Sequence, residues 1–252
     1  MFFGDDNDSD IPIPTNLNAN SEAIKANQNS SPATKSNSNK SSGTTTTTSS
    51  KNEAVESLIA VGMKGDDGAG PDKVLSKWIK GAVTFTVLSN PSSYSSQCVD
   101  AVIAEMNNLI DPVTFTRDDA SASPDITVRF ITQAELNEVY SRLGSPAPAN
   151  LHGYMTYESN HQGNEELLGG HIYISTDSPI SEVNRCGVIR HEMTHTIGLP
   201  FNSTLHNYSI FGFGIEGKSD YIEIDREVIR LLYNSGVLCG SNEAQVRFFF
   251  GI

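Results

Sequence analysis

The stretch "RCGVIRHEMTHTIGLPFNSTLHNYSIF", residues 185–211, decides the fold of this chain. It places His191 and His195 four residues apart, with Glu192 directly after the first histidine. In a helix, residues four apart lie one above the other, so both imidazoles can point at one metal ion. Glu192 would then lie beside the metal, where a carboxylate can take a proton from water.

The residues after the second histidine predict a sharp end to this helix. Gly198 allows a backbone conformation with positive φ, and Pro200 prevents the helix from continuing. The following loop is therefore expected to turn back toward the histidines and to deliver a third ligand.

Working outward from this helix, the pattern of apolar residues predicts alternating strands and helices. Residues 81–89, for example, alternate β-branched and aromatic residues as a strand does. In "SSQCVDAVIAEMNNLI" (95–110) the apolar residues recur at helical spacing, with serines placed to cap the start. Strands are expected at 81–89, 113–117, 125–132, 151–159 and 169–177, and helices at 133–144 (a short helix or a loop), 95–110, 181–198 and 220–236. This order predicts an α+β domain, with helices packed on one mixed sheet.

The N-terminal part of the chain has a different composition. Residues 1–57 are rich in Asn, Ser, Thr and Lys and hold few apolar side chains. Such a segment cannot bury enough surface to offset the entropy of ordering, so disorder is expected. Residues 58–79 are interpreted as a lead-in, and residues 80–252 as the patterned domain.

Composition and charge exclude several classes of protein. The formal net charge is −13, whereas a nucleic-acid-binding protein needs a basic face. No apolar run is long enough for a transmembrane helix, and the first residues do not resemble a signal peptide. The three cysteines, Cys98, Cys186 and Cys239, permit one disulfide. Either a Cys186–Cys239 bridge or free thiols at these two positions is expected.

Residues 80–236 resemble the zincin metallopeptidases, and specifically a metzincin domain of matrixin-like layout. The resemblance rests on "GAVTFTVLS", the helix from Ser95, "VTFTR", "DITVRFIT", "GGHIYIS", "HEMTHTIGL" and "YIEIDREVIRLLY". It implies one catalytic Zn²⁺, a peptide or protein substrate, a monomer, and an extracellular or cell-surface location. It also implies that the strand "GGHIYIS" forms the edge of the cleft, with Gly170, His171, Ile172 and Tyr173 pairing with an extended substrate.

Two departures from the family pattern affect the metal site. The family's third histidine stands six residues after the second, where this chain has Phe201, and the turn at 208–211 lacks the usual methionine. His206, on the returning loop, is expected as the displaced third ligand. Glu216 and Asp220 are the rival ligands.

Two further residues have alternative interpretations. Asp225, on the last predicted helix, either supports a ligand through a hydrogen bond or is a solvated charge. Tyr208, in the turn, either packs there or stabilises an oxyanion near the metal.

The function expected from the motif and the resemblance is zinc-dependent hydrolysis of peptide bonds. His191, His195 and His206 would bind zinc, and Glu192 would act as the general base. The alternative is a non-catalytic binding or surface module that keeps the fold and the zinc. A third reading, a domain without metal, holds only if the two helix histidines do not converge.

Overall fold

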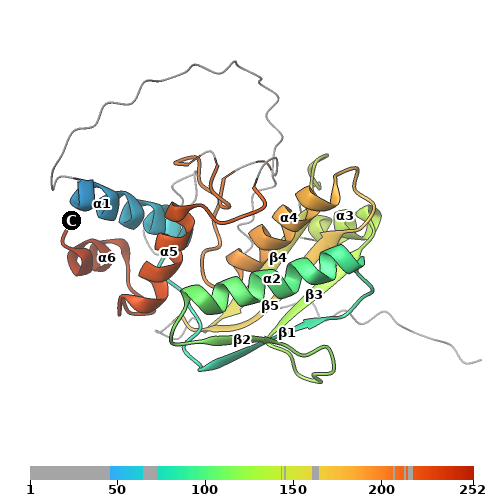
Figure 1. Ribbon diagram of the computed structural model, residues 1–252, viewed down its shortest axis with the longest axis horizontal. Coiled ribbons are helices and arrows are strands. Elements are labelled where there is room, and N and C mark those ends of the chain that lie inside the picture. The colour runs from blue at the N-terminus through green and yellow to red at the C-terminus, as the bar shows by residue number, and fades with distance from the viewer. Residues whose placement is uncertain are drawn as a thin grey trace, which may run out of the picture.

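The structure is a computed structural model that describes residues 46–64, 73–142, 144, 146–160, 165–206, 208–212, 214 and 218–252. These residues form one five-stranded mixed sheet with helices packed against it, shown in Figure 1. The α+β prediction is therefore confirmed. Within the described part of the chain, no helix has the length and apolar character that a membrane span requires.

The sheet has the strand order β2-β1-β3-β5-β4. Its first four strands run parallel, while β4 pairs antiparallel with β5 at one edge. All five strands lie where the alternation of apolar residues predicts them: β1 (Ala82–Val87), β2 (Thr114–Arg117), β3 (Ile126–Ile131), β4 (Gly153–Ser159) and β5 (Leu167–Ser175).

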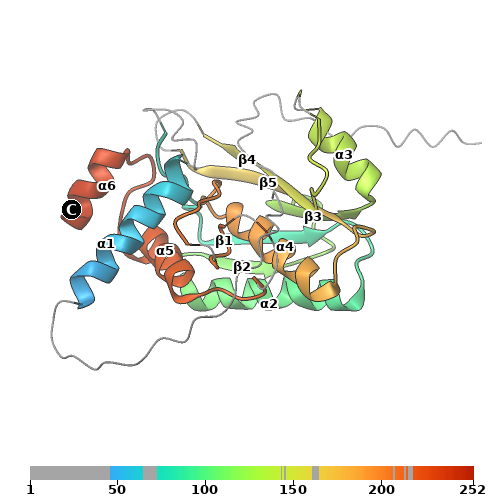
Figure 2. The same ribbon diagram turned by 90° about the horizontal axis from the view of Figure 1, so that it is seen from above.

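Two helices cover one face of the sheet. Figures 1 and 2 show α2 (Ser93–Leu109) and α4 (Glu182–His195) running side by side across it. The side chains of Ser92 and Ser181 cap the two helices by accepting backbone N–H groups. The main hydrophobic core lies between these helices and alternate residues of the strands, such as Phe85 and Ile172.

The opposite face of the sheet carries α3 (Gln133–Ser141). Successive side chains of a strand point to opposite faces, so Tyr154 and Tyr173 face away from the main core. They form a second apolar cluster with Leu136 of α3. The rings of Tyr140 and Tyr154 meet edge to face, with centroids 5.3 Å apart.

The remaining helices gather beyond one end of the sheet. Figure 2 shows α1 (Thr46–Ile59) beside α5 (Glu223–Asn234) and α6 (Glu243–Phe250), and the short π-helix η1 (Ala60–Lys64) continues α1. Fully buried side chains of α1, such as Val55 and Leu58, belong to the main core.

The helix α1 corrects the expected disorder of residues 1–57. Residues 46–57 are helical, because Ala54 and Val55 are buried in the core together with apolar residues further along α1. The rest of that expectation, residues 1–45, lies outside the described residues.

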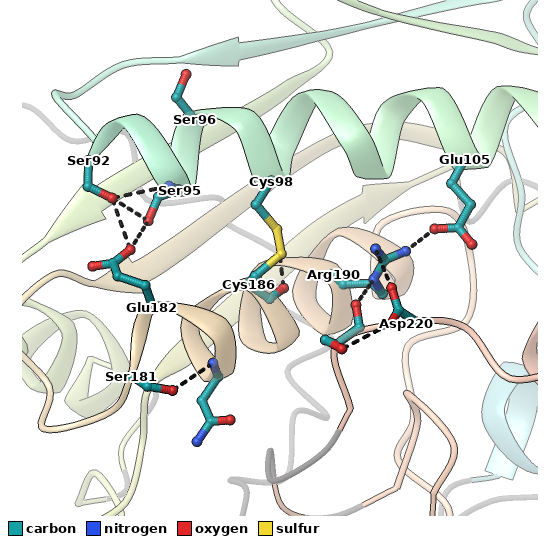
Figure 3. The surroundings of a disulfide bond; sticks show 12 residues. Ser92, Ser95, Ser96, Cys98, Glu105, Ser181, Glu182, Cys186, Arg190 and Asp220 are labelled. Carbon is teal, nitrogen blue, oxygen red and sulfur yellow. Dashed lines mark hydrogen bonds and ion pairs between the residues drawn. A yellow bond between two sulfur atoms is a disulfide. The ribbon is translucent and has the colours of Figure 1, made fainter.

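A disulfide joins the two helices on the sheet, as Figure 3 shows. It links Cys98 of α2 to Cys186 of α4, with the two Cα atoms 5.7 Å apart, and Cys239 is a free thiol. The expected choice between a Cys186–Cys239 bridge and two free thiols was therefore wrong. Cys98 and Cys186 lie on helices that pack against each other, which the sequence spacing did not reveal.

Ionic and polar contacts reinforce the same pair of helices on both sides of the disulfide (Figure 3). Glu182 of α4 accepts hydrogen bonds from Ser92 and Ser95 at the start of α2. At the other end, the buried side chain of Arg190 pairs with Glu105 of α2. The helix that carries the two histidines is thus held along its length.

Candidate metal and catalytic site

The two histidines of α4 converge as the motif predicts. His191 and His195 are both buried, and their Nε2 atoms lie 2.9 Å apart. The rings meet edge to face, with centroids 4.3 Å apart. Two nitrogen ligands of a tetrahedral zinc site with bonds of about 2.0–2.1 Å are separated by roughly 3.3 Å, so the observed spacing is close to what such a site needs.

Backbone carbonyls fix which nitrogen of each ring carries the proton. Nδ1 of His191 lies 2.5 Å from the Ile210 carbonyl oxygen, and Nδ1 of His195 lies 2.5 Å from that of Leu199. A carbonyl only accepts hydrogen bonds, so each Nδ1 donates one. In neutral rings, both Nε2 atoms then present lone pairs to the same point.

Burial keeps both rings neutral. It lowers the pKa of His191 well below its ordinary value, and the neighbouring ring of His195 adds to the effect. Burial also lowers the pKa of His195 to about 4, against the opposing effect of its hydrogen bonds to the Leu199 carbonyl and the Asn202 side chain. Two facing lone pairs repel each other at this distance, and a shared cation relieves that repulsion. The two Nε2 atoms are therefore arranged as a divalent metal requires of two of its ligands.

Glu192 lies between α4 and the outermost strand of the sheet. Its side chain is buried, and burial raises the pKa of the carboxyl group to about 8. Gly153 of β4 packs directly on it. A Cβ atom at position 153 would lie 2.9 Å from Cγ and 3.0 Å from Oε1 of Glu192. A glycine is therefore needed here for β4 to approach the carboxylate.

Gly198 ends the helical segment in the way the sequence predicts. Its φ is +101°, in the left-handed region. A Cβ atom there would lie 1.9 Å from the Ser76 carbonyl oxygen, which leaves no room for any other residue. The turn places Leu199 where its carbonyl meets His195.

His206 does not reach the two helix histidines. Its Nε2 atom lies 2.9 Å from the Ser57 hydroxyl of α1, and its Nδ1 atom lies 3.8 Å from the Glu53 carboxylate. Among the described residues, no group of three His, Cys, Asp or Glu side chains is placed to hold a metal. The expected three-histidine arrangement is therefore not assembled, because contacts with α1 hold His206 elsewhere.

Of the two rival ligands, Asp220 and Glu216, the structure describes only the first. Asp220 is exposed, lies 3.8 Å from the Arg190 guanidinium and accepts a hydrogen bond from Ser219, as Figure 3 shows for Arg190 and Asp220. These contacts place it beside Arg190, which also pairs with Glu105 of α2. Glu216 lies outside the described residues.

Of the two interpretations given for Asp225, its contacts fit a supporting role and not a solvated charge. Its carboxylate is fully buried and accepts hydrogen bonds from the Ser209 hydroxyl at 2.5 Å and from the Ile210 N–H at 3.1 Å. Ile210 is the residue whose carbonyl meets His191. Tyr208 in the same turn is 76% exposed, which does not fit a packing role.

The expected substrate-binding strand is not at the edge of the sheet. Gly170, His171, Ile172 and Tyr173 belong to β5, which pairs with β3 on one side and with β4 on the other. Both sets of backbone groups are used within the sheet, so this prediction was wrong. The strand at that edge is β4.

Two residues near the site escaped the sequence reasoning. Gly153 lies near the start of the strand predicted at 151–159 and carries no chemical signal of its own. Asn202 stands one position after Phe201, where the family pattern is interrupted, and it is 6% exposed. The available signal was a polar residue directly after the three apolar residues that follow the helix.

Comparison with known proteins gives a family for the chain. No curated protein matches it. Among solved structures, the one titled "Structure of Myroilysin" has 16% sequence identity and a TM-score of 0.40, and the match covers 62% of this chain and 82% of that chain. A similarity this weak says nothing of the site. Residues 51–250 match a family model over most of the chain. The chain belongs to the family described as Protein of unknown function (DUF2927).

Proposed function

We propose that this protein is a zinc-dependent peptidase whose metal is held by His191 and His195. The observation that carries the proposal is the convergence of the two Nε2 atoms, 2.9 Å apart, on rings whose Nδ1 atoms both face backbone carbonyls. Zinc, when bound, supplies a Lewis acid and acidifies a coordinated water to a pKa near 7.

Glu192 is the proposed general base. Its carboxylate follows the first histidine on the same helix and would accept a proton from the attacking water, then pass it to the leaving amine. Burial favours the neutral carboxyl group, whereas a divalent cation nearby favours the ionised form that a base requires. Metal binding would thus prepare Glu192 for its role.

The edge strand β4 offers a place for an extended substrate. Gly153 brings the backbone of this strand against Glu192. A peptide that adds to the edge of a sheet gains main-chain hydrogen bonds. Here that addition would bring the peptide's main chain close to the proposed base.

The alternative function is a zinc-containing binding module without catalysis. It is favoured by the position of His206, since no third His, Cys, Asp or Glu joins the pair among the described residues. Against it stands Glu192, because a zinc site without catalysis has no use for a carboxylate beside its ligands.

The test compares the wild type with Glu192→Gln and His195→Ala. Zinc content is measured by elemental analysis, and hydrolysis is measured on casein and on a quenched peptide library. The peptidase proposal expects zinc in the wild type and in Glu192→Gln, with turnover lowered at least about 100-fold in the latter. Zinc without hydrolysis in the wild type would favour the binding module, and a wild type that does not bind zinc would refute both.

A further inference from the structure

The loop after α4 is anchored to the site just before Asn202. The Leu199 carbonyl accepts the hydrogen bond of His195, and two residues later the Phe201 N–H donates to the Val61 carbonyl at 3.0 Å. Phe201 is buried as well. The backbone entering position 202 is therefore fixed relative to the ring of His195.

The same loop is anchored again just after Asn202. The Ser203 N–H donates to the Phe211 carbonyl at 2.9 Å. Phe211 directly follows Ile210, whose carbonyl meets His191. The two anchors place Asn202 between the segments that orient the two histidines.

The side chain of Asn202 lies against the ring of His195. It is 6% exposed and hydrogen-bonds to the ring of His195. The Nδ1 atom of that ring is already engaged with Leu199. A side-chain amide has an oxygen that can coordinate a cation and an NH₂ group that can donate to a nitrogen lone pair, and a rotation about χ2 exchanges them. Asn202 can thus serve the site with or without a metal.

The hydrogen bonds of His206 make it less suited than Asn202 to act as a third metal ligand. The Ser57 hydroxyl donates its only hydrogen to the Glu53 carbonyl at 2.9 Å. It therefore accepts from Nε2–H of His206, 2.9 Å away. The Nε2 atom of His206 therefore carries a proton, and its hydrogen bond holds the loop to α1.

We infer that Asn202 is the third protein ligand of the metal, in a set of two histidines and one amide oxygen. The inference rests on the proposed function, since it needs a metal on His191 and His195. A neutral oxygen ligand leaves the full charge of the ion in the site, so binding should be weaker than in sites with a carboxylate ligand.

The experiment measures the Kd of Zn²⁺ by competition with a chelating dye, and the visible absorption of the Co²⁺-loaded protein, for four chains. These are the wild type, Asn202→Ala, Asn202→Asp and the control His206→Ala. We expect about tenfold weaker zinc binding in Asn202→Ala and about tenfold tighter binding in Asn202→Asp, each with a changed cobalt spectrum. His206→Ala should match the wild type in both measurements.

The outcomes separate this inference from the function on which it rests. Unchanged affinity and spectrum in both Asn202 variants, with zinc bound by the wild type, would overturn the inference and leave the peptidase proposal standing. A loss of binding in His206→Ala alone would overturn it in favour of that histidine. If Asn202→Ala does not fold, as judged by circular dichroism, Asn202→Asp decides by tighter or unchanged binding. A wild type that binds no zinc overturns both.

Discussion

The Asp225 carboxylate accepts the backbone N–H of Ile210 at 3.1 Å and thereby fixes the turn that orients a candidate metal ligand. The carbonyl of the same residue lies 2.5 Å from Nδ1 of His191. Asp225 also accepts the N–H of Ile222 at 3.0 Å, at the start of its own helix. One buried carboxylate therefore ties α5 to the turn beneath the histidines.

Replacing Asp225 with Asn should loosen this turn and weaken metal binding. The amide substitutes an NH₂ donor for one of the two carboxylate oxygens, both of which accept hydrogen bonds, so at least one donor loses its partner. We expect zinc affinity to fall about 10- to 100-fold and stability to fall by about 2 kcal/mol. Zinc titration and urea denaturation measure the two effects.

Asp220→Asn is the matched control for this change. It alters the same residue type five positions earlier, but on an exposed side chain beside Arg190. It should leave zinc affinity unchanged. Equal zinc affinity in Asp225→Asn and the wild type would show that the turn does not orient His191.

Replacing Gly153 with Ala should impair hydrolysis without removing the metal. The new Cβ would lie 2.5 Å from Cγ1 of Val188 and 2.9 Å from Cγ of Glu192, so the carboxylate must move. We expect turnover to fall at least about tenfold, since general-base catalysis depends on position. Zinc content should stay at the wild-type level.

Gly81→Ala provides the comparison, because a Cβ at position 81 meets no atom within 4 Å. Turnover measured on the same peptide substrate should not change in this variant. If both variants hydrolyse it as fast as the wild type, Glu192 does not act from the position that the structure gives it.

The sequence predicted the individual helices and strands of this fold better than it predicted which strands lie next to one another. Each strand has a period of two, and α2 and α5 have a period of 3.6; these local patterns locate β1 to β5, α2 and α5. The histidine motif and the Gly198 and Pro200 that follow it locate α4. The order of strands depends on contacts between distant segments, which no local period records. That is why β5 was expected at the edge although β4 lies there.

The difference between local patterns and distant contacts also explains which residues of the candidate site were predicted correctly. His191, Glu192 and His195 share one helix, so their spacing alone brings them together. His206 lies on a loop, and its side chain is held by a hydrogen bond to Ser57 of α1. The sequence of α1 is mostly polar, so disorder was predicted over most of this helix. Only the last turns of α1 are apolar, which is too short a pattern for sequence reasoning to detect.

The disulfide between α2 and α4 should contribute measurably to stability. It closes a loop with a sequence separation of 88 residues. Changing both Cys98 and Cys186 to Ser should lower the free energy of unfolding by about 2–4 kcal/mol, mainly by freeing the unfolded chain. Urea denaturation measures this, with Cys239→Ser as a control that should change stability far less.

Alkylation tests the pairing directly. In denaturant without reductant, the thiol of Cys239 should be the one that reacts, and all three cysteines should react after reduction. Mass spectrometry that finds Cys98 alkylated before reduction would contradict the bridge.

The buried carboxyl group of Glu192 should make the metal-free protein less stable as the pH rises. Its pKa in the folded protein is raised to about 8, whereas the unfolded chain ionises near the ordinary value of 4.5. Below pH 4.5 both states hold the proton and the contribution of Glu192 to stability is fully present. Between pH 4.5 and 8 the unfolded state releases its proton first, so the free energy of unfolding falls by up to about 1.4 kcal/mol per pH unit.

The histidines act in the opposite direction, so a difference between two proteins isolates Glu192. The lowered pKa of His195 means that stability rises with pH between about 4 and 6.5, equally in the wild type and in Glu192→Gln. The variant replaces the carboxyl group with an amide of the same shape that does not ionise. Urea denaturation with chelator at pH 5, 6, 7 and 8 should show Glu192→Gln gaining stability over the wild type at each step. A difference that stays constant across this range would mean that Glu192 titrates alike in both states and is not buried as the structure shows.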